Sequence, residues 1–212
     1  MSRTAESLID YTDTESRITF TVRRPDMRYL NEFMALKCAP DLLAWGVYPN
    51  VKEVTESFAA FHAVRKALGE DKLKSPAIRV ICVGDGRSPR TAACFAVRSA
   101  WVAYSVDPNL VNPVGWNTKI KRLTCLRLKV EDLDWRTTTG FPDDFVTVVV
   151  AVHSHAKLAQ CEKFRPALVV AVPCCVPQEY DGRPPDYSYT DWGILSPKRT
   201  VKVWDNRRRA TT

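Results

Sequence analysis

Long hydrophobic runs recur in the second half of the chain. Five segments are rich in Val, Ile, Leu and Ala, and several are continuous rather than alternating: residues 78–84, 101–107, 122–130, 145–152 and 167–172. Continuous runs of this length are typical of strands buried on both faces of a parallel sheet. Helices are predicted between the first two runs, over "PRTAACFAVRSA", and between the last two, over "AKLAQCEKF". This alternation predicts right-handed crossovers and an α/β fold with a Rossmann-like, doubly wound sheet.

The C-terminal part has a different pattern. The segments "DWGIL" and "TVKVW" flank "SPKR", which predicts a terminal antiparallel hairpin. We therefore expect a mostly parallel sheet that ends in this hairpin, within a Rossmann-like domain over residues 76–205. Residues 206–212, which include "NRRR", are expected to form a basic tail.

The N-terminal segment, residues 1–75, is expected to pack on this core. Residues 1–16 look like a polar lead, 17–24 have the composition of a strand, and 28–38 suit a short helix. A clearer helix begins after Asn50, because Asn50 can cap it and a glutamate follows three positions later. Its apolar residues recur at helical spacing and form one stripe: Val51, Val54, Phe58, Phe61, Val64 and Leu68. Gly69 follows this stripe and can cap the end of the helix.

Composition narrows the class of protein. A chain of 212 residues suits one α/β domain. It contains no apolar run of about 18 residues, and its N-terminus lacks the apolar core of a signal peptide. We therefore expect a cytoplasmic protein with no membrane partner, whose seven cysteines are reduced and mostly buried. The net charge of +7 adds RNA as a candidate partner.

The turn after the first hydrophobic run reads "VGDGRSPRT". Gly84 and Gly86 allow a sharp turn and the close approach of a ligand. Ser88 is a good N-cap and Pro89 suits the first helical position, so free N–H groups are expected to face the turn and attract an anion or a carboxylate. A dinucleotide fingerprint would need glycine at position 89, and a phosphate-binding P-loop would need a lysine; both are missing.

Two acids follow at successive strand ends. Asp107 ends the second run and is in the position of an acid that binds ribose hydroxyls. Asp132, in "KVEDLDW", follows the next run, where it could meet an adenine edge or lie on the surface.

Together, these motifs resemble the class I S-adenosylmethionine-dependent methyltransferases over residues 78–175. The later part is similar to the methyltransferase domain 32 group, which has a His motif after strand four and Pro-Cys-Cys after strand five. Here "AVHSHAKLA" and "VVAVPCCVP" stand at those places. The resemblance implies that the cofactor is S-adenosylmethionine. It also implies that Gly84, Asp85, Gly86, Arg87 and Ser88 wrap the methionine end, that Asp107 holds the ribose and that Asp132 holds the adenine.

The chain departs from that family at several positions. Cys82 stands where the family has an acid, Ser88 stands in place of a third glycine, and Val176 replaces a histidine after Pro-Cys-Cys. Asp85 is a candidate replacement for the missing carboxylate. These departures favour, as an alternative, a catalytically inactive methyltransferase-like binding or scaffold protein.

His153, His155, Cys174 and Cys175 end two successive hydrophobic runs. His and Cys are zinc ligands, but alternate residues at a strand end diverge and no CxxC pair occurs, so we expect no metal site. A cysteine nucleophile for pyrimidine methylation is disfavoured, since such enzymes place Pro-Cys after strand four. We expect His153 or His155 to act as a base or substrate contact. The two cysteines are expected either to pack as small buried residues that close the sheet edge or to line the substrate side of the pocket.

The leading prediction is therefore an S-adenosylmethionine-dependent methyltransferase with RNA as a candidate substrate. The inactive scaffold is the main alternative. A third hypothesis is an enzyme that binds another nucleotide, with Arg87 and Arg90 contacting its phosphates.

Overall fold

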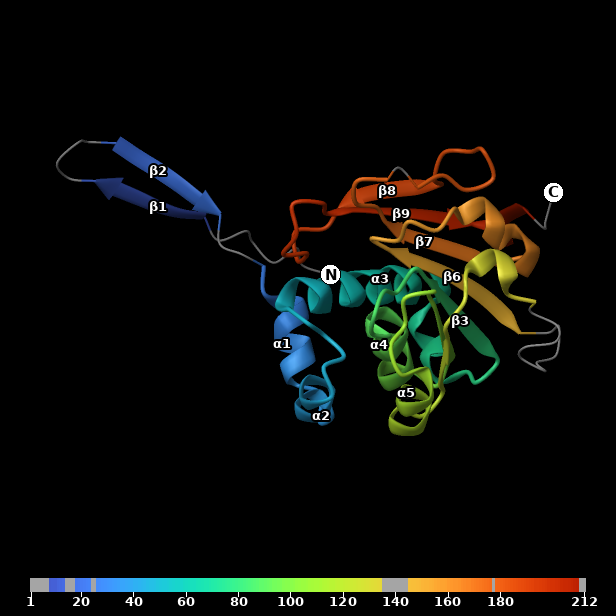
Figure 1. Cartoon of the computed structure of the whole chain (residues 1–212). Coiled ribbons are helices and arrows are strands. Elements are labelled where there is room, and N and C mark those ends of the chain that lie inside the picture. The colour runs from blue at the N-terminus through green and yellow to red at the C-terminus, as the bar shows by residue number, and fades with distance from the viewer. Residues whose placement is uncertain (1–7, 14–17, 24–25, 135–144, 177, 210–212) are drawn as a thin grey trace.

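The computed structural model describes residues 8–13, 18–23, 26–134, 145–176 and 178–209, and its centre is a seven-stranded sheet (Figure 1). The strand order is β5-β4-β3-β6-β7-β9-β8. The strands are β3 (Ile78–Val83), β4 (Val102–Val106), β5 (Leu123–Leu126), β6 (Val146–Val152), β7 (Leu168–Val172), β8 (Tyr187–Thr190) and β9 (Thr200–Asp205). β3 to β7 are parallel, whereas β9 pairs antiparallel with both β7 and β8. The predicted fold class is confirmed.

The hydrophobic runs form the buried centre of this sheet. Every residue of β3 and β7 is buried, because these strands lie inside the sheet and are covered on both faces. β5 is only four residues long, shorter than the predicted run over 122–130. It is the edge strand, and its alternating burial reflects cover on one face.

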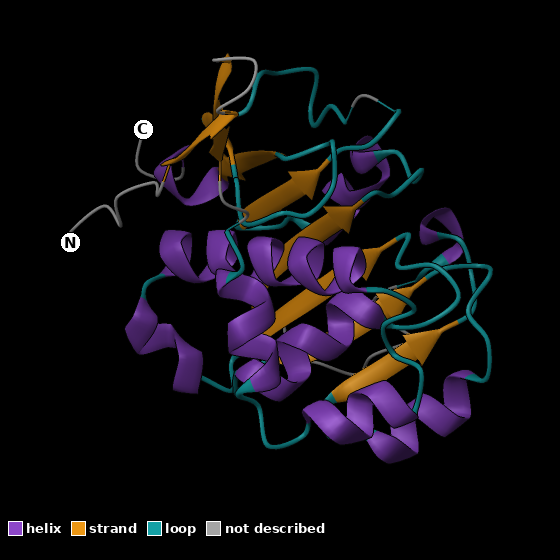
Figure 2. Cartoon of the chain, turned by 90° about the vertical axis from the view of Figure 1, so that its left-hand side faces the viewer, coloured by secondary structure: helices purple, strands orange, loops and turns teal. Residues whose placement is uncertain are grey.

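Helices lie on one side of the sheet (Figure 2). They are α1 (Arg28–Met34), α2 (Ala39–Ala44), α3 (Val51–Leu68), α4 (Arg90–Arg98) and α5 (Pro113–Lys119). α3, α4 and α5 contact the strands of the sheet, and α1 packs on α3. The predicted cap of α3 is confirmed, since Oδ1 of Asn50 accepts from the backbone N–H of Glu53. α3 packs across β6, β7 and β9, and its own side chains Phe58 and Phe61 are buried.

The other face carries only short 3₁₀ segments within the described residues. η2 (Val130–Asp132) and η3 (Leu158–Phe164) contribute Val130, Leu158 and Phe164 to a second core cluster. The α-helix expected over "AKLAQCEKF" is therefore wrong, because the segment forms the tighter 3₁₀ geometry of η3. No side chain caps its start, and Arg165 adopts the left-handed conformation directly before a proline, which ends the segment.

The terminal hairpin exists, but its first strand was misplaced. β8 is formed by residues 187–190, and "DWGIL" lies in the connection to β9. Asp191 directs this departure: its carboxylate pairs with Arg28 and accepts from the hydroxyl of Tyr29 at 2.6 Å. These bonds draw the chain away from the sheet and toward α1.

The N-terminal residues contain an unexpected strand. β1 (Leu8–Asp13) pairs antiparallel with β2 (Ile18–Arg23), so the polar lead expected over 1–16 was wrong for residues 8–13. At the other end of the chain, the 3₁₀ segment η4 (Asn206–Arg209) follows β9. Another 3₁₀ segment, η1 (Glu70–Lys74), follows α3. Residues 210–212 of the predicted tail lie outside the described residues. Among the described helices, none has the length and apolarity needed to cross a membrane.

Candidate functional site

A cleft of about 420 Å³ lies at the carboxyl edge of the parallel strands. It is lined by the turn after β3, the end of β4, the start of η2 and the loop after β6. Gly84, Gly86 and Asp107 all line this cleft, as the order of turn, helix, strand and acid predicted. Both predicted histidines, His153 and His155, line it too. A cleft at this edge is where open α/β sheets bind ligands.

The glycine turn is bonded directly to the end of β4. The backbone N–H of Gly84 donates to the carbonyl of Val106 at 2.9 Å, and that of Gly86 donates to Oδ2 of Asp107 at 2.8 Å. Both glycines have positive φ. A Cβ on Gly84 would lie 2.1 Å from Oγ of Ser154, so only glycine fits there.

Asp107 keeps spare acceptor capacity. Oδ2 accepts from Gly86, Oδ1 accepts from the backbone N–H of Asn109 at 2.7 Å, and the residue is buried. A carboxylate has about four lone-pair sites, so each oxygen can accept a further hydrogen bond. The side chain of Asp107 is therefore held in place by two backbone N–H groups and can accept further hydrogen bonds.

The start of α4 differs from the prediction. The helix begins at Arg90, and Ser88 does not cap it; Oγ of Ser88 instead donates to the carbonyl of Val47 at 2.7 Å. The cap is Asp85, whose carboxylate accepts from the N–H groups of Thr91 at 2.8 Å and Ala92 at 3.1 Å. The anion attracted to this helix end is thus the protein's own.

Asp85 is consequently a structural residue in this geometry. It is 2% exposed, and Oδ2 also accepts from the hydroxyl of Ser105 at 2.9 Å. Burial raises the pKa of its carboxyl, although Arg90 and the helix N–H groups oppose that change. Asp85, Arg87 and Ser88 are not among the residues that line the cleft, and Arg87 is exposed.

Cys82 lies in the apolar core rather than at the cleft. It is 1% exposed and belongs to the cluster that β3 forms with α3 and α4. Burial, followed by the nearby Asp85 carboxylate, raises the pKa of its thiol well above the usual range. An acid at this position would be buried beside Asp85, so Cys82→Asp is expected to destabilise the fold rather than to restore a cofactor contact.

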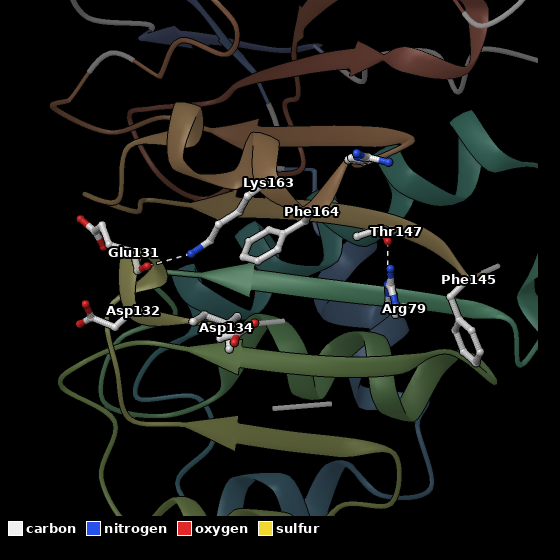
Figure 3. Close-up of a pocket in the computed structure, with 10 residues that line it drawn as sticks. Arg79, Glu131, Asp132, Asp134, Phe145, Thr147, Lys163 and Phe164 are labelled. Atoms are coloured by element: carbon white, nitrogen blue, oxygen red, sulfur yellow. Dashed lines mark hydrogen bonds between the residues drawn. The ribbon is translucent and has the colours of Figure 1, made fainter. Parts of the chain in front are cut away.

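Asp132 lies outside the cleft. It is exposed and lines a second cavity of about 580 Å³, which Figure 3 shows extending from Glu131 and Asp132 at one end to Arg79 and Phe145 at the other. Its neighbour Glu131 lines both cavities. Asp132 is therefore not among the residues that line the cleft, whereas its neighbour Glu131 is.

Two acids of α3, Glu53 and Glu56, approach the cleft, and no motif in the sequence predicts a role there for either. Glu53 forms an ion pair with Arg90 at 2.9 Å, and Glu56, whose side chain is 1% exposed, lies 3.3 Å from Nε2 of His153. Lys52 also pairs with Glu56, at 3.0 Å. The available signal was the run of charges in the first turns of α3, beside its apolar stripe. Because Glu53 pairs with Arg90, part of the positive charge of Arg90 is already compensated, which makes Arg90 a weaker candidate for binding a phosphate.

His153 is held as a neutral base. Burial, then the charges of Lys52 and Arg90, lower its pKa from 6.5 to about 4. Burial also raises the pKa of Glu56, against the influence of Lys52. His153 has a positive φ of 49°, and its N–H donates to the carbonyl of Val172, which ties the end of β6 to β7. The imidazole is therefore positioned and unprotonated at neutral pH.

His155 separates from His153 and meets the cysteine pair. Sγ of Cys175 lies 3.8 Å from Nε2 of His155 and 3.6 Å from Sγ of Cys174. Burial would raise the pKa of Cys174, but hydrogen bonds from the backbone N–H groups of Val176 and Cys175, and contacts with Cys175 and His155, lower it to about 7. Cys174 and Cys175 do not line the cleft, but Cys175 contacts His155, which does.

No protein-family model matches the chain, and no curated protein matches it. The fold is similar to that of MtNAS in complex with MTA and tNA, with 12% identity and a TM-score of 0.45 over 85% of this chain and 69% of that one. A point mutant of MtNAS in complex with S-adenosylmethionine gives 13% identity and TM-score 0.45, over 85% and 71%. At this level of similarity, a functional assignment has to be argued from the geometry of the cleft.

Proposed function

We propose that this chain is an S-adenosylmethionine-dependent methyltransferase that binds its cofactor in the cleft between β3 and β4. The observation that carries the proposal is the bond between Gly86 and Asp107, which fixes an acceptor for ribose hydroxyls beside a tight glycine turn. In the reaction the acceptor attacks the sulfonium methyl group, the carbon–sulfur bond breaks, and S-adenosylhomocysteine leaves. The protein contributes mainly alignment and proximity.

Cofactor recognition is divided between two acids. Asp107 holds the ribose hydroxyls through its remaining lone pairs. Glu131 takes the role first expected of Asp132, because Glu131 lines the cleft and Asp132 does not. The glycine turn would hold the methionine end, because Gly84 and Gly86 line the cleft and carry no side chains that would block it.

His153 is the proposed base. An oxygen or nitrogen acceptor that gains a methyl group has to lose a proton, and an unprotonated imidazole lining the cleft can take it. Glu56 lies directly behind that imidazole and stabilises the imidazolium that forms. His155 is left as a contact on the substrate side.

Calorimetric titration tests the cofactor assignment. S-adenosylmethionine and S-adenosylhomocysteine should each bind one site per chain, whereas ATP should not. Glu131→Gln should weaken binding, and the neighbouring Asp132→Asn, matched in chemistry but outside the cleft, should leave it unchanged. Equal effects of the two substitutions would contradict the assignment of Glu131. ATP binding alone would favour the nucleotide-enzyme alternative with Arg90.

RNA is the proposed acceptor class, supported by the net charge of +7. Transfer of an isotope-labelled methyl group from the cofactor to total cellular RNA, with a protein mixture as the parallel acceptor, tests it. Label in protein but not in RNA would reject RNA. Cofactor binding without transfer to either would favour the inactive scaffold, which the core position of Cys82 also suits.

A further inference from the structure

Three soft or borderline ligands meet at the edge of the cleft. His155 lies in the loop after β6, and Cys174 and Cys175 lie in the loop after β7. β6 and β7 are adjacent and parallel, so both loops leave the sheet at the same edge. The ligand atoms of the three residues all lie within 4.8 Å of one another.

The spacing of these atoms fits a tetrahedral metal ion. The two Sγ atoms are 3.6 Å apart, and Sγ of Cys175 is 3.8 Å from Nε2 of His155. With metal–sulfur bonds of about 2.3 Å and metal–nitrogen bonds of about 2.0 Å, adjacent ligand atoms in a tetrahedron are separated by about 3.5–3.8 Å. Two of the three separations therefore already match such a tetrahedron, and the third, between Cys174 and His155, is at most 4.8 Å.

The chemistry of the cluster selects the ion. Two sulfurs and one imidazole nitrogen, with no carboxylate in the group, suit zinc and disfavour magnesium and calcium, which need oxygen ligands. The cluster is also accessible, since His155 and Cys175 are exposed and Cys174 is half-buried. Cys82, Cys94, Cys125 and Cys161 are instead buried in the two core clusters.

Although the sequence leads us to expect no metal site, we propose that His155, Cys174 and Cys175, which the fold brings together, bind one zinc ion through three protein ligands. Three ligands leave the fourth position to water or to a substrate atom, which is the arrangement of zinc sites that act on ligands rather than purely structural ones. His155 also lines the cleft, so the ion lies at its margin, next to the proposed acceptor side. The zinc site is independent of whether the cleft binds S-adenosylmethionine.

Metal titration of the full chain tests the site. After chelator treatment and under reducing conditions, zinc is titrated against a chromophoric competitor, and cobalt is used as a spectroscopic probe. One equivalent of zinc should bind, and cobalt should give the intense thiolate-to-metal charge-transfer absorption. Magnesium should not compete. Binding well below one equivalent, or a cobalt spectrum without that absorption, would overturn the proposal.

Single substitutions identify the ligands. Cys174→Ser, Cys175→Ser and His155→Asn should each weaken zinc binding by more than about tenfold. Tenfold is about the smallest loss seen when a residue that only hydrogen-bonds to a metal ligand is replaced, so losing a ligand itself should cost more. Cys38→Ser is the matched control, because Cys38 is a half-buried thiol elsewhere in the chain, and its zinc affinity should equal that of the wild type. Thermal melts confirm that each variant is folded. Unchanged affinity in the two cysteine variants, or recovery of the pair as a disulfide in reducing buffer, would reject the site.

Discussion

The backbone N–H of Gly86 donates to Oδ2 of Asp107 over 2.8 Å. This one bond joins the turn after β3 to the end of β4, across a separation of 21 residues in the sequence. It means that the position of the acid is set by the turn itself rather than by the loop that follows β4. The same carboxylate then orders that loop, through the N–H of Asn109.

Removing this carboxylate should weaken cofactor binding. Asp107→Ala loses charge-assisted hydrogen bonds worth about 1.5–3 kcal/mol each. Loss of one such bond to the ribose corresponds to about a ten- to hundredfold weaker affinity for S-adenosylhomocysteine by calorimetry. Asp71→Asn, at an exposed aspartate on η1, is the control and should bind as the wild type does. Wild-type affinity in Asp107→Ala would exclude Asp107 as the ribose acceptor.

The sheet and its cleft were predictable because both depend on local sequence patterns. Continuous runs such as residues 78–84 and 145–152 can be buried on both faces only inside a parallel sheet, and parallel strands place their following loops at one edge. Gly84, Gly86 and Asp107 could therefore be assigned to one cleft without any knowledge of side-chain contacts.

The missed features depend on contacts between distant segments. Glu56 approaches His153 only because α3 packs across β6, and no local pattern joins the two. The sequence predicted Ser88, not Asp85, as the acceptor at the start of α4. Both residues can accept hydrogen bonds at a helix start, and which of them does so depends on how the turn folds back. Asp132 and Glu131 are adjacent, so a shift of one residue decides which of them lines the cleft.

Gly84→Ala should destabilise the fold more than Gly46→Ala. The two glycines have nearly the same φ, +69° and +70°, so both substitutions force a left-handed alanine at a cost of about 1–2 kcal/mol. At Gly46 the new Cβ meets nothing within 4 Å, whereas at Gly84 it lies 2.1 Å from Oγ of Ser154. Overpacking adds about 1–3 kcal/mol at Gly84 only. Urea unfolding of both variants measures the difference.

The double variant Gly84→Ala with Ser154→Gly isolates the cause. Ser154→Gly removes Oγ and Cβ, the two atoms nearest to the new Cβ, and leaves only the backbone Cα at 3.1 Å. It should therefore recover part of the loss caused by Gly84→Ala. Strictly additive free energies of unfolding would show that the clash contributes nothing.

Asp85→Ala should cost more stability than Ser88→Ala. Asp85→Ala leaves the N–H groups of Thr91 and Ala92 without their acceptor in a buried site, a loss of at least about 2 kcal/mol. Ser88→Ala removes only the bond to the carbonyl of Val47, worth about 0.5–1.5 kcal/mol. Urea midpoints at unchanged slope give both values. The reverse order would restore Ser88 as the cap of α4.

The stability of the protein should depend on pH through His153. Its pKa falls from 6.5 to about 4 in the folded chain, through burial and the charges of Lys52 and Arg90. Between these two values the unfolded chain binds a proton that the folded chain does not. Unfolding therefore becomes easier as the pH falls from 6.5 toward 4, and the contribution is constant above 6.5.

Two variants at this position separate titration from backbone strain. His153→Asn and His153→Ala both remove the imidazole, but Asn tolerates the positive φ of 49° better than Ala does. Both should lose the His153 part of the pH dependence equally, while His153→Ala is less stable at every pH. Glu56 has a raised pKa and contributes with the opposite sign, and it remains in both variants, so the comparison with the wild type reports mainly on the imidazole. Free energies of unfolding from urea titrations between pH 4 and pH 7.5 decide the matter. A constant difference between wild type and His153→Asn across this range would mean that His153 protonates equally in both states, and its assignment as a buried neutral base would then fail.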